Sequence, residues 1–332
     1  MISFLQRSLL VCFLSLLTVP LLAAETDAQL EPGEFAAADA GTYIAGELVF
    51  IDPVNRRGGI RLDGDEKGRY HTGPLHYFAL LPYGTVWHNG SLAEIRDIPI
   101  GTHVHGYFVV PPKGEEATIG PLPNDQKQFT IRQNHAISLE DDFSFYQRRG
   151  QSWKVVSVDA EKEKINVEPM GTMAKDGITT GYAFDSNTVT RIWKDRWLGD
   201  LADIEPGTSV QLNLGWSQGW RDREFTVFDI WLDEESRSFA TELQRRRHVR
   251  YQRQRWVPGW IDHVEHFDFG GGIMTLTFFA VDPSLIAEFK KEQADAFAVA
   301  CAENTLRTWF HRADRKFAKR SEEPRGGKEW RS

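Results

Sequence analysis

A segment with the pattern Asp-Ile-x-x-Gly-Thr-x-Val occurs twice, and this internal repeat limits the folds open to the chain more than any other feature. The first copy covers 97–104 and the second covers 203–210, which lies 106 positions later. Two further pairs of stretches recur in the same order: 47–52 with 154–159 at an offset of 107, and 84–86 with 187–189 at an offset of 103. Three landmarks at nearly one spacing indicate two copies of one structural unit.

Each copy consists of short runs rich in β-branched and aromatic residues, and turn residues separate these runs. This pattern is typical of strands, and several short strands in succession predict a small closed barrel or sandwich. In the repeated turn, glycine supplies a positive φ and aspartate binds nearby backbone amides. We interpret six residues as structural turn residues: Asp97, Gly101, Thr102, Asp203, Gly207 and Thr208.

A third unit begins with Trp260–Asp262 and a glycine turn at 270–272, and then diverges from the other two. After its return strand, Asp282 as N-cap and Pro283 at the first helical position predict a helix. The apolar stripe of this helix reaches Cys301, which indicates a packed thiol rather than a reactive one. The fold class is therefore mainly β with helical connectors: tandem small barrels, the third modified by a C-terminal helix.

The first 24 residues have the pattern of a secretory signal peptide. Arg7 precedes an apolar run over 9–22, and Leu22-Ala23-Ala24 offers small residues for cleavage. The same pattern also suits an uncleaved N-terminal anchor, and both alternatives place the rest of the chain outside the cytoplasm, in the periplasm or secreted. No other segment has the roughly 20 apolar residues that a membrane span needs. Cleavage would leave Cys301 as the only thiol, which excludes an intrachain disulfide framework.

The following division of the chain results: signal peptide 1–24, flexible acidic leader 25–41, barrel unit 42–136, connector 137–150, barrel unit 151–232, arginine-rich connector helix 233–256, partial β unit with helix 257–310, and basic tail 311–332.

The opening strands and the two Asp-Ile-x-x-Gly-Thr-x-Val segments make the chain resemble the short OB-like β-barrel repeats of exported bacterial proteins. The resemblance covers roughly 42–279 and implies a fold that binds nucleic acids, sugars or proteins, or serves as a spacer. Nucleic acid is not an expected partner, because 47 acidic residues outnumber 39 basic ones and the net charge is −8. A cell-envelope protein or polysaccharide is the expected partner.

Histidines are the first candidate site residues. His103 and His105 are separated by one residue on an expected strand, so both imidazoles lie on one face and can bind a transition metal. The other candidates for completing such a site are His71, His76 and His88. The alternative is a pair of hydrogen-bonded histidines on a strand face. The second unit has Ser209 and Gln211 at the matching positions, so the site would belong to the first unit alone.

Tryptophan and arginine give a second candidate surface for a ligand or partner: Trp193, Trp197, Trp216 and Trp220 with Arg245, Arg246 and Arg250. Exposed tryptophans can stack on sugar rings or anchor a protein, and the alternative is packing at the barrel ends. The arginines suit an anionic partner, although pairing with acidic residues of the same chain is the interpretation we favour.

No residue is assigned a catalytic role, since the sequence has neither His-Glu-x-x-His nor Cys-x-x-Cys. The leading hypothesis is a non-enzymatic binding or scaffolding protein of the cell envelope. A metal-binding protein or metal-dependent hydrolase with its site in the first unit is the alternative, and a carbohydrate-binding module is the third.

Overall fold

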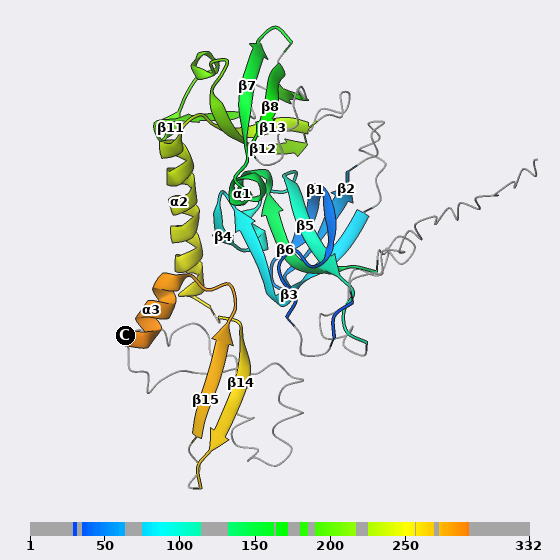
Figure 1. Ribbon diagram of the computed structural model, residues 1–332, viewed down its shortest axis with the longest axis vertical. Coiled ribbons are helices and arrows are strands. Elements are labelled where there is room, and N and C mark those ends of the chain that lie inside the picture. The colour runs from blue at the N-terminus through cyan, green and yellow to red at the C-terminus, as the bar shows by residue number, and fades with distance from the viewer. Residues whose placement is uncertain are drawn as a thin grey trace, which may run out of the picture.

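The computed structural model of the protein describes residues 29–31, 35–63, 75–113, 132–162, 164–171, 180–184, 190–216, 225–255, 257–268 and 272–291. These residues form a mainly β structure of two barrels and a separate two-stranded hairpin, connected by helices (Figure 1). The predicted signal peptide, the glycine turn at 270–271 and the tail from 311 lie outside the described residues. Among the described helices, none is long and apolar enough to cross a lipid bilayer.

The first barrel closes through five strands: β1 (Thr42–Asp52), β2 (Arg57–Leu62), β3 (Leu75–His88), β5 (His103–Val109) and β6 (His135–Asp141). The strand order is β2-β1-β5-β6-β3, and pairing of β2 with β3 completes the circle. The pairing of β3 with β6 is parallel, and the other pairings are antiparallel. Short β4 (Ser91–Ala93) and the 3-10 helix η1 (Ile95–Asp97) connect β3 to β5.

Large apolar side chains fill this barrel, including Leu48, Phe78 and Phe108, which have no exposed surface. The alternating burial of β3 follows from the period of two along a strand. Strand β6 is buried along its whole length, because the barrel interior lies on one side, and Leu30, Ala38 and α1 lie on the other. This strand corrects the predicted boundary at 136: residues 137–141 complete the first barrel instead of forming a connector.

The second barrel repeats this arrangement with β7 (Ser152–Asp159), β8 (Lys164–Met170), β9 (Thr180–Phe184), β12 (Ser209–Trp216) and β13 (Phe225–Trp231). Its order is β9-β8-β7-β12-β13, and pairing of β13 with β9 closes it. The hairpin of β10 (Arg191–Lys194) and β11 (Trp197–Leu198) extends the sheet from β13, and the 3-10 helix η4 (Leu201–Asp203) follows.

The repeated turn has the same hydrogen bonds in both barrels. Gly101 (φ 94°) donates to the carbonyl of Leu48, and Gly207 (φ 91°) donates to that of Val155. The stretch 187–189, which the sequence pairs with 84–86 at an offset of 103, lies outside the described residues. The hairpin turns instead correspond at an offset of 106, because His88 pairs with Ser91 across the first turn and Lys194 pairs with Trp197 across the second.

A helix leaves each barrel, and in both cases an aspartate caps it. Asp141 accepts from Ser144 N at the start of α1 (Asp142–Arg148), and Asp233 accepts from Ser236 N at the start of α2 (Glu234–Gln252). The same four residues hold the hairpin turn of their own barrel. Asn89 N donates to Asp141 and Gly90 N to Ser144, while Asp195 N donates to Asp233 and Arg196 N to Ser236.

The third unit consists of the hairpin β14 (Gly259–His266) and β15 (Gly272–Phe278), followed by α3 (Pro283–Lys291). Asp282 accepts from Ser284 N at 2.9 Å, at the start of α3. Most residues of both strands are exposed, and no further strand joins them in the part of the chain described. The hairpin extends away from the barrels at the far end of α2 (Figure 1). Cys301 lies beyond the described residues.

Several residues of the predicted flexible leader have contacts with the first barrel, among them Gln29, Leu30 and Ala36. Leu30 is buried, donates to the carbonyl of Val110, and packs in an apolar cluster with Leu81, Val109 and Ile137. The interpretation as a flexible leader is therefore wrong for these residues. The apolar side chains of the leader lack a helical or strand period, but Leu30 and Ala36 pack against an apolar cluster on the outside of the barrel.

Candidate functional site

The five candidate histidines do not form one cluster. His76 lies in the wall of the first barrel against Phe108, where neither ring nitrogen bonds to any described residue. His88 lies at the end of β3 and bonds to Asp141, and His71 lies outside the described residues. Only His103 and His105 come together, with their ring centroids 4.8 Å apart on one face of β5.

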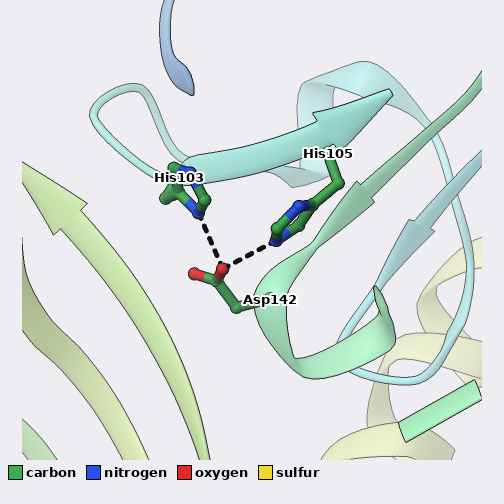
Figure 2. A group of neighbouring side chains, drawn as sticks. All are labelled: His103, His105 and Asp142. Carbon is green, nitrogen blue, oxygen red and sulfur yellow. Dashed lines mark hydrogen bonds and ion pairs between the residues drawn. The ribbon is translucent and has the colours of Figure 1, made fainter. Parts of the chain in front are cut away.

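Asp142, the first residue of α1, lies between these two imidazoles (Figure 2). Its Oδ1 atom accepts from His103 Nδ1 at 2.7 Å and from His105 Nε2 at 2.9 Å. One ligand atom from each of the three residues lies within 4.8 Å of the others, and all three side chains are buried. Two imidazole nitrogens and a carboxylate oxygen form a ligand set that zinc and related ions accept.

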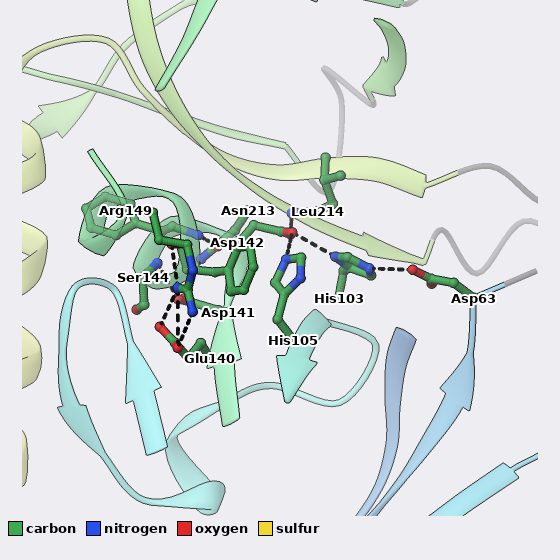
Figure 3. A network of polar contacts seen from close by, with 12 residues as sticks. Asp63, His103, His105, Glu140, Asp141, Asp142, Ser144, Arg149, Asn213 and Leu214 are labelled. Carbon is green, nitrogen blue, oxygen red and sulfur yellow. Dashed lines mark hydrogen bonds and ion pairs between the residues drawn. The ribbon is translucent and has the colours of Figure 1, made fainter. Parts of the chain in front are cut away.

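The second heteroatom of each of these side chains also has a partner, and Figure 3 shows the partners of His103 and Asp142. His103 Nε2 donates to Asp63 Oδ2 at 3.1 Å, and the Tyr43 hydroxyl donates to His105 Nδ1 at 2.6 Å. Asp142 Oδ2 accepts from the backbone amide of Leu214 at 2.8 Å. Such outer contacts orient the ligands of protein metal sites and fix the histidine tautomers.

The site lies where the two barrels meet. His103 and His105 belong to the first barrel, whereas Leu214 and Phe225 belong to the second. The Phe225 ring contacts the His103 ring edge-on, with the ring centroids 4.6 Å apart. The Phe145 ring of α1 stacks on the His105 ring, with the centroids 3.9 Å apart. These aromatic rings cover the imidazoles, so the site is closed.

Charge within the site is concentrated on His103 and Asp142. Burial alone would lower the pKa of His103, but the carboxylates of Asp142 and Asp63 outweigh it and raise the pKa to about 10. Burial opposes ionisation of Asp142, yet the two histidines hold its pKa well below the usual value. Burial lowers the pKa of His105. Without a metal, His103 is therefore a cation, Asp142 an anion and His105 neutral.

A second buried network adjoins the first. Asp141 Oδ2 accepts from His88 Nδ1 at 2.7 Å and from Asn213 Nδ2 at 2.9 Å. Asn213 Oδ1 in turn accepts from the backbone amide of Phe143 at 2.8 Å. Burial disfavours the Asp141 carboxylate, but His88 and the hydrogen bonds lower its pKa. Asp141 and Asp142 thus bind the two barrels to each other through neighbouring side chains.

The second barrel has no such group of ligands at the corresponding positions. Ser209 bonds to Ser152 Oγ, and Gln211 donates to the carbonyl of Gln151. Glu234, the first residue of α2, is exposed and forms an ion pair with Arg237. Because the backbone arrangement matches and the side chains do not, these three residues serve as matched controls for the site.

The structure places Trp193, Trp197 and the three arginines apart from this site. Trp193 Nε1 donates to Asp229, whereas Trp197 is exposed. Trp220 and the side chain of Trp216 lie outside the described part of the chain. Arg245 forms ion pairs with Glu242 and Asp282, and Arg246 pairs with Glu242. Arg250 is exposed on α2.

The six turn residues belong to connections between strands of the two barrels. Asp97 accepts from Glu94 N and Asp203 from Asp200 N, so each carboxylate binds its own 3-10 turn. Thr102 and Thr208 donate their backbone amides to Pro99 and Glu205, respectively.

One match to Gly-x-Ser-x-Gly occurs at 215–219, where the residues are Gly-Trp-Ser-Gln-Gly. In α/β hydrolases this motif joins a strand to a helix and exposes a nucleophilic serine. Here Gly215 belongs to β12, and the next described element is the antiparallel strand β13. The context therefore differs from that of a nucleophile elbow, and Ser217 lies outside the described residues.

A comparison with protein-family models gives no match, and neither does one with curated proteins. Two solved structures are similar to a part of the chain. A silver(I) complex, Ag(I)CusF, has 17% identity and a TM-score of 0.17 over 25% of this chain and 95% of its own. A tryptophan-to-alanine variant of Escherichia coli CusF with Cu(II) has 16% identity and a TM-score of 0.18 over 25% and 90%. Scores this low establish neither a ligand nor a function for the present protein.

Proposed function

We propose that the protein binds one divalent transition-metal ion through His103, His105 and Asp142. The observation that carries the proposal is a buried set of three ligand atoms whose side chains are each oriented by a further partner. The nitrogen–oxygen distances of 2.7 and 2.9 Å are those of hydrogen bonds. In a tetrahedral zinc site, ligand atoms lie about 3.3 Å apart. Metal binding would therefore replace the shared protons and move Asp142 Oδ1 outward by about 0.5 Å.

The ligand set favours some metals over others. Two imidazoles and one carboxylate suit Zn²⁺, Co²⁺, Ni²⁺ or Cu²⁺, whereas Mg²⁺ and Ca²⁺ require oxygen ligands and Cu⁺ prefers sulfur. Binding would release the Nδ1 proton of His103, because both of its nitrogens are protonated in the metal-free site. It would also shift the proton of His105 from Nε2 to Nδ1, where the Tyr43 hydroxyl oxygen would accept it.

Burial supports a binding role over a hydrolytic one. A catalytic zinc keeps a position open to water and substrate. Here His103, His105 and Asp142 are all buried, and Phe225 and Phe145 cover the two imidazoles. We therefore favour a non-enzymatic metal-binding protein in which the ion strengthens the contact between the barrels, and the hydrolase alternative has less support.

The test uses protein purified without a histidine tag, loaded with zinc and analysed for metal content and by calorimetric titration. We expect close to one ion per chain, and loss of that ion in the His103→Ala/His105→Ala variant. The Ser209→Ala/Gln211→Ala variant changes the matching positions of the second barrel and should keep the ion. No zinc bound at stoichiometric concentration, or equal binding by both variants, would overturn the proposal.

We further infer that the protein is exported and acts in the cell envelope, with a protein or polysaccharide as its partner. The support is the pattern of 1–24, with Arg7, the apolar run and the small residues before Glu25. Fractionation of cells that produce the chain should recover it in the periplasm or medium. Retention of the protein in the cytoplasm would contradict this inference.

A further inference from the structure

Exposed apolar and basic side chains line one side of α2, beginning at the turn between β10 and β11. Trp197 and Leu198 follow this turn and are 78% and 65% exposed. Phe239 and Leu243 on α2 are 41% and 49% exposed. Arg246 and Arg250 continue the same helix side, because the four helical residues recur at spacings of four, three and four. We call these six residues the α2 surface.

The turn that presents Trp197 is strained. Asp195 and Arg196 have φ values of 50° and 68°, a region that side chains disfavour. The first barrel uses Asn89 and Gly90 at the corresponding turn, and both tolerate this conformation far better. Hydrogen bonds to Asp233 and Ser236 hold the strained turn on the start of α2, and Arg196 also pairs with Glu235. Strain that the surroundings maintain in this way is a feature of functional sites.

The charge of α2 differs in sign from that of the whole protein. Seven arginines and three glutamates lie between 234 and 255, whereas the chain has a net charge of −8. Arg247 and Arg250 have no ion pair or hydrogen bond with the described residues. On an acidic protein, such a local basic surface attracts anions, whereas the rest of the protein surface repels them.

We propose that the α2 surface binds the surface of an anionic lipid bilayer. Tryptophan and leucine at a protruding turn suit insertion into the interface between headgroups and acyl chains, where tryptophan is favoured. Arginines beside them bind phosphate headgroups. An acidic protein partner would match the arginines equally well, but two highly exposed apolar residues side by side in β11 favour the continuous apolar phase of a bilayer. This proposal does not depend on the metal site.

The experiment compares sedimentation of the full chain with vesicles of phosphatidylglycerol and phosphatidylcholine against vesicles of phosphatidylcholine alone. The readout is the ratio of the two partition coefficients. The uncharged apolar run at 9–22 contributes the same binding free energy to both kinds of vesicle, so it multiplies both coefficients by one factor, which cancels in the ratio. We expect the ratio to fall between about fivefold and 25-fold in Arg246→Gln/Arg250→Gln, since each arginine near the surface contributes roughly fivefold.

A second variant and two controls complete the test. Trp197→Ser/Leu198→Ser should weaken binding to both kinds of vesicle. The controls Val54→Ser and Lys162→Gln alter exposed positions of the two barrels and should change neither partition coefficient. A ratio near one for the unaltered protein would overturn the proposal. So would an unchanged ratio in the arginine variant, or binding to polyglutamate without binding to vesicles. Adding a chelator should leave the ratio unchanged, which separates this result from the proposed metal function.

Discussion

Asp141 and Asp142 are consecutive residues whose carboxylates bind different histidines of the first barrel. Asp141 holds His88, and Asp142 holds His103 and His105. Each carboxylate also accepts from the second barrel, through Asn213 or the amide of Leu214. Two neighbouring side chains therefore hold the barrels together and, at Asp142, provide a metal ligand.

Asp142→Asn should abolish zinc binding and destabilise the protein. The change removes the anion that compensates buried His103, and breaking one partner of a buried ion pair typically costs about 3–5 kcal/mol. Urea unfolding and zinc titration measure the two effects. The control is Glu234→Gln at the corresponding exposed position of α2, where we expect a change of less than about 0.5 kcal/mol. Equal effects of the two substitutions would contradict the assigned role of Asp142.

The metal-free protein should lose stability at alkaline pH because of His103. The pKa of His103 is raised from 6.5 to about 10 on folding. Its protonation therefore contributes fully to the free energy of unfolding below pH 6.5, and this contribution disappears as the pH rises through about 10. Urea unfolding across this range should show the decline, and His103→Gln should flatten it. Saturating zinc should also remove the decline, because the bound imidazole no longer carries the proton. A decline that persists in His103→Gln would assign it to other groups.

His76 should destabilise the fold in acid. Burial lowers its pKa from 6.5 to about 4, so the unfolded chain binds a proton more readily. Stability is full above pH 6.5 and decreases as the pH falls to about 4, by about 3 kcal/mol in all. His76→Met replaces the ring by an apolar side chain of similar volume and should reduce this slope. Replacing exposed His266 in the same way should leave the slope as it is.

Asn213→Ala should weaken the contact between the barrels. The side chain donates to Asp141 and accepts from the amide of Phe143, so its removal leaves two buried groups with fewer partners. We expect a loss of about 1–3 kcal/mol in unfolding free energy, and faster hydrogen exchange at Phe143. Asn166→Ala removes a partly exposed amide that bonds only to Ser157 and should cost less. Unchanged protection of Phe143 in the Asn213 variant would disprove this account.

Gly90 and Gly150 both have a positive φ, but they should differ in how well they tolerate substitution by alanine. At Gly90 (φ 78°) a Cβ atom would lie 2.7 Å from Thr241 Oγ1 and 2.8 Å from Phe143 Cε1. At Gly150 (φ 67°) nothing lies within 4 Å. Gly150→Ala should therefore cost only the left-handed conformation, about 1–2 kcal/mol, while Gly90→Ala adds about 1–3 kcal/mol for crowding. Thermal unfolding of both variants checks the order.

The β content and the closed barrel could be predicted from strand periodicity and turn residues, because both follow from local preferences. The boundary after the first barrel could not. Residues 137–140 (Ile-Ser-Leu-Glu) do alternate as in a strand, but the acidic residues Glu140 and Asp141 have the composition of an exposed connector, whereas in β6 every residue is buried. The sequence offers another signal, since Asp-Asp-Phe-Ser at 141–144 recurs as Asp-Glu-Glu-Ser at 233–236 and marks the start of each helix.

The histidine pair of the site could be predicted, because residues two apart on a strand share a face. Its third member could not, because Asp142 approaches His103 only through the packing of α1 between the barrels. His71, His76 and His88 were candidates by proximity in sequence, but β3 directs His76 and His88 to different surroundings. Distances of this kind depend on barrel closure, which involves pairings between residues far apart in the chain.

The bond between Asp142 and Leu214 has a consequence for synthesis on the ribosome. The two residues are separated by 72 positions, so the amide of Leu214 is made about 4–14 seconds after the carboxylate it binds. During that interval the first barrel can close, but one side of the nascent His103–Asp142 pair remains open to water. A metal ion or a proton can therefore reach the site more readily before the second barrel covers it than afterwards.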